Sequence, residues 1–232
     1  MPRPPRTDAA GRLYHALNRG NSRATIFHKA GDFEAFERIL SEGLEQYRVQ
    51  LLSYQLMPNH WHLVLSPQID GAMSRFLSWA TGTHTMRYHA HYHTSGDGHV
   101  YQGRFKSFPI QDDNHFYTVC RYVERNALRA KLAARAEDWQ WGSLWRWLQQ
   151  PEPEPRLLSP WPMHRLSNWV NRVNEPLSEN ELSAVQNCLK RGSPLGDSKW
   201  VNATAKRFHL ESTIRPRGRP RIQCLPEDSK ES

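Results

Sequence analysis

The sequence is poor in cysteine and has no long apolar run, and each shortage excludes a class of protein. Its 232 residues include three cysteines, Cys120, Cys188 and Cys224, which lie far apart and form no C-x-x-C motif. This favours a reducing compartment over a disulfide-stapled secreted scaffold. No segment approaches the roughly 18 consecutive apolar residues that a membrane-spanning helix needs. The first residues also lack the apolar core of a secretory signal peptide, so we expect no membrane partner.

Acidic residues are in deficit as well. The chain has 31 Lys and Arg against 23 Asp and Glu, which gives a formal net charge of +8 at pH 7. A basic protein without a membrane segment favours a polyanionic partner, nucleic acid above all. We therefore expect a cytoplasmic, nucleoid-associated protein.

Hydrophobic periodicity predicts the fold of the first 150 residues. A period of two indicates strands, and apolar spacings of three and four indicate helices. The order strand, helix, strand, strand, helix, strand predicts an α+β, ferredoxin-like fold, an antiparallel sheet with helices on one face. The predicted strands are 12–19, 49–56, 60–67 and 103–111, and the predicted helices are 32–47, 70–92 and one that begins near Asn114.

The rest of the chain predicts smaller units. Ser178 and Glu181 form an S-x-x-E capping box that opens one helix, and Asp197 can cap a second. The last segment is too polar and proline-rich to fold alone. The predicted organisation is a main domain over 1–150, a Pro-rich linker over 151–176, a small helical appendage over 177–210 and a basic tail over 211–232.

The motif His60-Trp61-His62 is the sharpest local signal. In a strand, residues i and i+2 point to the same face, so both imidazoles converge while Trp61 points away. Two converging imidazoles can share one divalent cation. Because the chain has twelve histidines, an isolated pair of this kind is also consistent with ordinary surface or core histidines.

The predicted last helix carries a polar, basic stripe beside its apolar face. Tyr122 and Asn126 are four residues apart and therefore lie on one edge of the helix. Arg125 and Arg129 belong to the same stripe. A phenol at this edge can be reached by a substrate while it stays ordered; the alternative is a tyrosine that only packs its ring on the sheet. Tyr117 falls on the far side of the helix from Asn126, which makes it the weaker candidate for a nucleophile.

Several runs of sequence resemble one family in both order and spacing. They are LLSYQLMPNHWHLVLSP, YQGRFKSF, CRYVERNALRAKL and WQWGS. Together they resemble the HUH single-tyrosine transposases and, within them, the REP-associated tyrosine transposases. The resemblance implies that His60 and His62 bind a divalent metal, that Tyr122 is the nucleophile, and that Asn126 supplies a third metal ligand. The chain departs from the family at RNAL, where relatives usually show RNP and Ala127 stands in place of the proline.

The implied enzyme cuts and joins single-stranded DNA at hairpin-forming palindromic repeats. A phosphodiester is an anion that repels a nucleophile, so a hard cation such as Mg²⁺ or Mn²⁺ is needed to neutralise its oxygens. Attack by the phenol would give a 5′-phosphotyrosine and a free 3′-hydroxyl, which can reverse the reaction without ATP. One alternative is a domesticated hairpin-binding protein that does not cut. Another is a replication or relaxase nuclease, disfavoured because the chain has no helicase or primase segment. Monomer and homodimer both remain open.

Basic side chains near the proposed centre predict the DNA contacts. Lys and Arg supply most of the affinity for phosphate and make binding depend on salt. The tail RPRGRPR resembles an AT-hook, although plain electrostatic anchoring to duplex DNA fits equally well. The histidine cluster His84, His89, His91, His93 and His99 offers a second, weaker metal site. The predicted DNA-binding residues are Gln102, Arg104, Lys106, Arg125, Arg129, Arg215, Arg217, Arg219 and Arg221.

Overall fold

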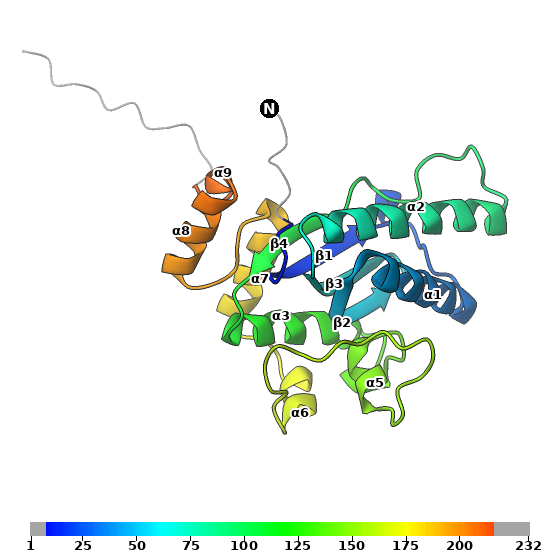
Figure 1. Cartoon of the computed structure of the whole chain (residues 1–232). Helices are drawn as coiled ribbons and strands as arrows, with labels where there is room; N and C mark the ends of the chain where they lie inside the picture. Colours follow the sequence, from blue (N-terminus) through cyan, green and yellow to red (C-terminus); the bar gives the residue numbers. More distant parts are fainter. Residues whose placement is uncertain (1–7, 216–232) are drawn as a thin grey trace, which may run out of the picture.

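Four antiparallel strands form the central sheet (Figure 1). The computed structural model describes residues 8–215. Strands β1 (Leu13–Arg19), β2 (Val49–Met57), β3 (His60–Pro67) and β4 (Lys106–Ile110) lie in the order β2-β3-β1-β4. Helix α1 (Ala30–Tyr47) connects β1 to β2, and α2 (Ala72–Tyr92) connects β3 to β4. The predicted ferredoxin-like fold is confirmed, with a β4 shorter than the sequence indicates.

The two crossover helices cover one face of the sheet. Period-two alternation turns Tyr14, Ala16 and Trp61 toward α1 and α2, where they are buried in the first hydrophobic core. The helices approach closely at Gly43, because a Cβ there would lie 2.7 Å from the ring of Phe76. The prediction of helices on one face therefore holds for α1 and α2 (Figure 1).

Helix α3 (Asn114–Glu124), followed by the short α4 (Asn126–Arg129), covers the opposite face. Its apolar stripe packs Val119 against Val64 and Phe108 in a second core. At the junction the Arg125 N–H donates to the carbonyl of Arg121 at 3.0 Å, as in a continuous helix. The four-residue spacing on which the predicted site depends is therefore kept.

Further helices follow, and their caps agree with the sequence. The hydroxyl of Ser178 accepts from the N–H of Glu181 at 3.2 Å, and the carboxylate of Asp197 accepts from the N–H of Trp200 at 2.9 Å. Within residues 8–215 no helix combines the length and apolarity needed to cross a membrane. The helices are α5 (Ser143–Leu148), α6 (Trp169–Asn174), α7 (Glu179–Arg191), α8 (Ser198–Arg207) and α9 (Glu211–Ile214), with 3-10 turns at Asn21–Arg23 and Ala136–Asp138.

The segment 151–176, predicted as an extended linker, is packed against the body instead. It contains α6, whose Trp169 is fully buried in the second core. The indole of Trp161 donates to the carbonyl of Leu52 on β2 at 2.6 Å. Proline content argued for an extended chain, but the aromatic residues between the prolines bury enough apolar surface to dock it.

The segment predicted as an appendage is also docked, at the free edge of the sheet. The Leu195 N–H donates to the carbonyl of Pro109, and the Gln111 N–H donates to the carbonyl of Leu195, each at 2.9 Å. Leu195 thereby pairs with Ile110 and covers the exposed edge of β4. Helix α7 packs against β4 and α3 as a result.

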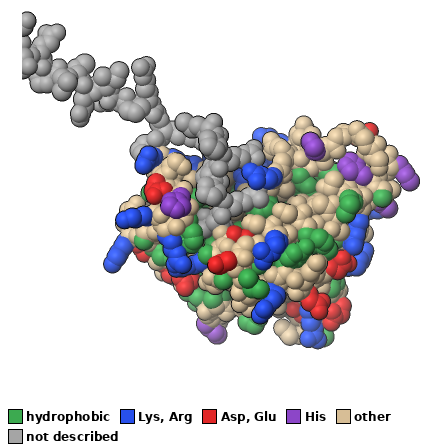
Figure 2. All heavy atoms as spheres, turned by 45° about the horizontal axis from the view of Figure 1, so that its top comes forward, with side chains coloured by type: hydrophobic (Ala, Val, Ile, Leu, Met, Phe, Trp, Pro, Cys, Tyr) green, Lys and Arg blue, Asp and Glu red, His purple; other side chains and the backbone are tan. Residues whose placement is uncertain are grey.

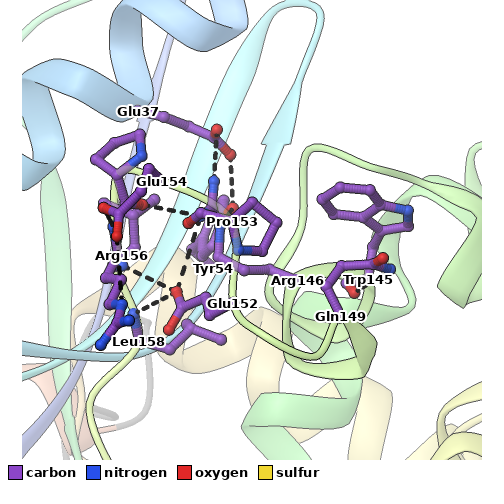
Figure 3. Close-up of polar contacts among 12 residues, drawn as sticks. Glu37, Tyr54, Trp145, Arg146, Gln149, Glu152, Pro153, Glu154, Arg156 and Leu158 are labelled. Atoms are coloured by element: carbon purple, nitrogen blue, oxygen red, sulfur yellow. Dashed lines mark hydrogen bonds and ion pairs between the residues drawn. The ribbon is translucent and has the colours of Figure 1, made fainter.

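A buried polar cluster ties the Pro-rich segment to the α1 side of the sheet (Figure 3). The hydroxyl of Tyr54 donates to Glu37 Oε1 at 2.6 Å and accepts from Arg146 Nε at 2.9 Å. The Arg146 guanidinium also bonds Glu37 Oε2 at 2.8 Å and the carbonyls of Pro153 and Pro155 at 2.7 and 2.9 Å. One arginine thus fixes the path of the chain after α5.

Candidate active site

The strand register places both histidines of the H-x-H motif on the face that α3 covers. His62 lies opposite Leu17 of β1 and Gln55 of β2, and its ring is 2% exposed. The ring centroids of His60 and His62 are 5.1 Å apart and nearly perpendicular, at 83°. The ring of Tyr122 meets His62 edge-on with centroids 5.7 Å apart. The predicted nucleophile and the predicted metal ligands therefore lie together.

Hydrogen bonds orient both imidazoles. His60 Nδ1 lies 2.6 Å from Asn59 Oδ1, an acceptor, so this nitrogen carries the proton and Nε2 keeps its lone pair. His62 Nδ1 lies 2.9 Å from Nε2 of His15 on β1. Burial, with a smaller contribution from Arg19 and Arg129, lowers the pKa of His60 to about 4. Burial also lowers the pKa of His62 well below its usual value, so both rings are neutral at neutral pH, as metal binding requires.

Arg129 lies between the amide of Asn126 and the phenol ring. Its Nη2 donates to Asn126 Oδ1 at 3.2 Å, and its guanidinium carbon lies 5.0 Å from the ring centroid of Tyr122. A cation over the ring face is a favourable contact. Asn126 Oδ1 is the atom that the family resemblance assigns to a metal. In this structure it accepts a hydrogen bond from Arg129.

The donor set fits a hard cation only in part. Two neutral imidazoles and an amide oxygen suit Mn²⁺ or Mg²⁺ when water completes the coordination. Residues 8–215 contain no cluster of three or more His, Cys, Asp or Glu side chains suited to hold a metal. A cation at His60 and His62 would therefore need Asn126 or the substrate as a further ligand. The same finding gives no support to a second metal site among the histidines of α2.

These residues open into a cleft of about 1060 Å³. Among the described residues its lining includes six Lys and Arg side chains and no Asp or Glu. A cleft lined by one sign of charge attracts a polyanion. Further cations gather over α8 at the left of Figure 2, where Lys199, Lys206 and Arg207 are exposed. The basic residues of the cleft are Arg19, Arg104, Lys106, Arg129, Lys190 and Arg191.

Three predicted DNA-binding residues reach the cleft from the β4 side. Lys106 pairs with Leu17, and Leu17 pairs with His62, so Lys106 shares the face of the histidines. The Gln102 N–H donates to the carbonyl of Arg19 at 2.9 Å, which holds the segment of Gln102 and Arg104 beside the end of β1. Both side chains line the cleft.

Other predicted residues lie elsewhere. Arg125 donates to the carbonyls of Val173 and Asn174 and does not line the cleft. Tyr117 donates to the carbonyl of His164 at 2.6 Å, away from the histidines. The carbonyl of Arg215 accepts from Arg191. The remaining tail residues, Arg217, Arg219 and Arg221, lie outside the described residues.

Four contributors to the site were not predicted from the sequence: His15, Arg19, Lys190 and Arg191. The alternation of β1 puts His15 on the face opposite Tyr14 and Ala16, but its contact with His62 depends on the pairing of β1 with β3. Lys190 reaches the cleft because α7 docks on β4, which is a long-range contact without a local signal.

Unpaired polar atoms concentrate at this site. Five buried side-chain nitrogens of residues 8–215 have no hydrogen-bond partner, and four of them surround the histidines. Buried polar groups are normally paired, so a cluster of unpaired ones indicates a place that another molecule or ion completes. The four are His15 Nδ1, Arg19 Nε, Gln55 Nε2 and Asn126 Nδ2, and the fifth is Arg165 Nη1.

Comparisons with known proteins bear on the family and the fold of the chain. Residues 10–126 match the family model described as IS200-like transposase, a range that includes both histidines, Tyr122 and Asn126. A solved REP-associated tyrosine transposase bound to a REP hairpin is similar in fold, with a TM-score of 0.53 at 14% identity, covering 77% of this chain and 100% of that chain. A putative transposase from Deinococcus radiodurans is more distant, with a TM-score of 0.38 at 16% identity, covering 53% and 95%. No curated protein matches the chain.

Proposed function

We propose, on the premise that the chain belongs to the IS200-like transposase family, that it cleaves and rejoins hairpin-forming single-stranded DNA with Tyr122 as the nucleophile. The observation that carries the proposal is the meeting of Tyr122, two neutral histidines and Asn126 at one basic cleft. The solved relative bound to a REP hairpin suggests palindromic repeats of that kind as the substrate class.

His60, His62 and Asn126 are the residues that would hold Mg²⁺ or Mn²⁺. His60 offers Nε2, because its Nδ1 is committed to Asn59. Asn126 offers Oδ1 once Arg129 releases it. When bound, the cation supplies charge neutralisation and orientation of the phosphodiester oxygens.

Tyr122 forms the new bond in this mechanism. Its phenol oxygen attacks phosphorus, the bond from phosphorus to the 3′-oxygen breaks, and the phenol proton ends on that oxygen. The products are a 5′-phosphotyrosine and a 3′-hydroxyl, and attack by another 3′-hydroxyl reverses the step. No carboxylate among the described residues lines the cleft to act as a base. The cation that faces the phenol ring is Arg129.

The DNA path follows the basic lining. Lys106, Arg104 and Gln102 line the cleft from β4 and the segment before it, and Lys190 and Arg191 line it from α7. The predicted appendage thus contributes a wall of the cleft. The tail after Arg215 is proposed to hold duplex flanks, and deleting it is expected to weaken binding to long DNA while cleavage of a short hairpin persists.

The experiment uses hairpin oligonucleotides with single-stranded flanks, labelled on the 3′ side of each candidate cleavage point, with Mn²⁺ or Mg²⁺. The proposal predicts a labelled protein adduct that survives denaturation. Tyr122→Phe should lose the adduct and keep hairpin binding, and Tyr117→Phe, the matched control on the same helix, should keep both.

The runner-up is a hairpin-binding protein that does not cut. It predicts tight hairpin binding and no adduct from the wild type under any metal condition. An adduct that persists in Tyr122→Phe and disappears in Tyr117→Phe would assign the nucleophile to Tyr117 instead.

A further inference from the structure

We propose that His15 is a positioning residue that sets the tautomer of His62 and so prepares it to bind the metal. The inference rests on the metal site of the proposed function. His15 is fully buried, its Nε2 lies 2.9 Å from His62 Nδ1, and the two rings stack with centroids 5.0 Å apart at 7°.

The fold holds His15 in this place from three sides. β1 pairs with β3 so that His15 lies opposite Val64, one cross-strand step from His62 on the same face. The ring of Phe108 meets His15 edge-on at 5.1 Å, and the ring of Tyr122 does so at 6.2 Å. A ring confined in this way has no room to turn from its partner.

The hydrogen bond between the two rings can be made in two ways, and only one is compatible with a metal. If His15 donates, His62 carries its proton on Nε2 and has no lone pair there for a cation. If His62 donates from Nδ1, its Nε2 is free. A metal-ligating histidine usually donates its other ring nitrogen to such an acceptor.

The outer nitrogen of His15 has no partner in either arrangement. When His62 donates, neutral His15 carries its own proton on Nδ1, and this atom is buried without a hydrogen-bond partner. When His15 donates instead, the same nitrogen is an unpaired acceptor, so this atom costs free energy in both arrangements and does not by itself select one. A cation on His62 Nε2 is compatible only with donation from His62 Nδ1, and His15 Nε2 is the acceptor that this donation requires.

The decisive measurement is Mn²⁺ affinity of the full-length protein by titration calorimetry, without DNA. His15→Leu removes the acceptor and should weaken Mn²⁺ binding about 10- to 100-fold. His15→Gln places an amide oxygen where Nε2 accepts and should retain most of the affinity. His84→Leu is the matched control, since His84 is a buried histidine on the other face that also makes a hydrogen bond, between its Nδ1 and the hydroxyl of Tyr101 at 2.8 Å. It should bind Mn²⁺ like the wild type.

A second measurement covers the case in which His15→Leu fails to fold. Nitrogen chemical shifts of the imidazoles in the wild type, followed by NMR during Zn²⁺ or Mg²⁺ titration, should show His62 protonated on Nδ1 in the loaded state. Wild-type affinity in folded His15→Leu, or a loaded His62 without a proton on Nδ1, would overturn the positioning role alone. A wild type that binds no Mn²⁺ would overturn the proposed metal centre and this inference with it.

Discussion

The two faces of the sheet carry polar clusters of opposite character. On the α1 side, Glu37, Tyr54 and Arg146 are buried and every polar side-chain atom of the three has a partner (Figure 3). On the α3 side, four buried side-chain nitrogens around His60 and His62 have no hydrogen-bond partner. A closed cluster holds chain segments together, whereas an open one is ready for a ligand.

The closed cluster is not a simple gain in stability. Burial raises the pKa of Glu37, and this outweighs the opposing effects of Arg146 and Tyr54. Desolvation of a buried ion pair commonly offsets its attraction. The cluster instead specifies one path of the chain after α5, because Arg146 also donates to the carbonyls of Pro153 and Pro155.

The largest expected effect is a loss of activity when a residue of the α3 face of the sheet is changed, but not when a histidine of α2 is changed. His60→Ala should abolish metal-dependent cleavage, because a ligand is lost, while the free energy of unfolding changes by no more than about 1 kcal/mol. His91→Ala, an exposed histidine at the end of α2, is the control and should leave both unchanged. Adduct formation with Mn²⁺ and denaturant unfolding measure the two quantities. Full activity of the wild type in excess EDTA would show that the open cluster is not a metal site.

The second expected effect is a loss of stability when the buried cluster on the α1 side of the sheet is broken. Arg146→Met removes the positive charge that pairs with the buried Glu37 carboxylate and the donor to two carbonyls, and should cost about 3–5 kcal/mol of unfolding free energy. Arg87→Met breaks an exposed pair with Glu42, whose side chains are 52% and 49% accessible, and should cost less than about 1 kcal/mol. Denaturant melts of both variants give the comparison. Equal losses would mean that the closed cluster is no more important than a surface pair.

The sequence predicts local features well and long-range ones poorly. Strand alternation suffices to place His60 and His62 on one face, and helical spacing suffices to place Tyr122 beside Asn126. The contact of His15 with His62 depends on strand order, which periodicity does not contain. The family resemblance adds catalytic and metal-binding roles for His60, His62, Tyr122 and Asn126. It adds no role for His15.

The C-terminal half shows the same limit. The capping residues Ser178 and Asp197 mark the starts of α7 and α8, because caps act within one turn. The docking of α7 on β4 is decided by Leu195 and by the second core, in which Val185 of α7 is buried. For this reason the linker and the appendage were predicted as separate units, and Lys190 was not predicted as part of the cleft.

The third expected effect is a pH dependence of the unfolding free energy that arises from His84 on α2. Burial lowers the pKa of His84 from 6.5 to about 4, so between these values the unfolded chain binds a proton that the folded chain does not. The contribution of His84 to stability is therefore complete above pH 6.5 and is lost as the pH falls toward 4, by an amount on the order of 3 kcal/mol. His84→Asn keeps an acceptor for Tyr101 and cannot be protonated in this range. Its unfolding free energy should fall less steeply with acid than that of the wild type, and parallel curves would contradict the assignment.

The smallest expected effect tests whether the open cluster extends to α7. Lys190 is exposed and lines the cleft beside Gln186, four residues earlier on the same helix face. A cation so placed should contact one phosphate of the bound strand. Lys190→Gln should therefore lower the slope of log affinity against log salt by about 0.7 on single-stranded DNA and leave the cleavage rate at saturating DNA unchanged. Lys206→Gln, which removes an equally exposed cation from α8 outside the cleft, should leave the slope as it is. If both variants change the slope equally, α7 contributes general positive charge and the site ends at the sheet and α3.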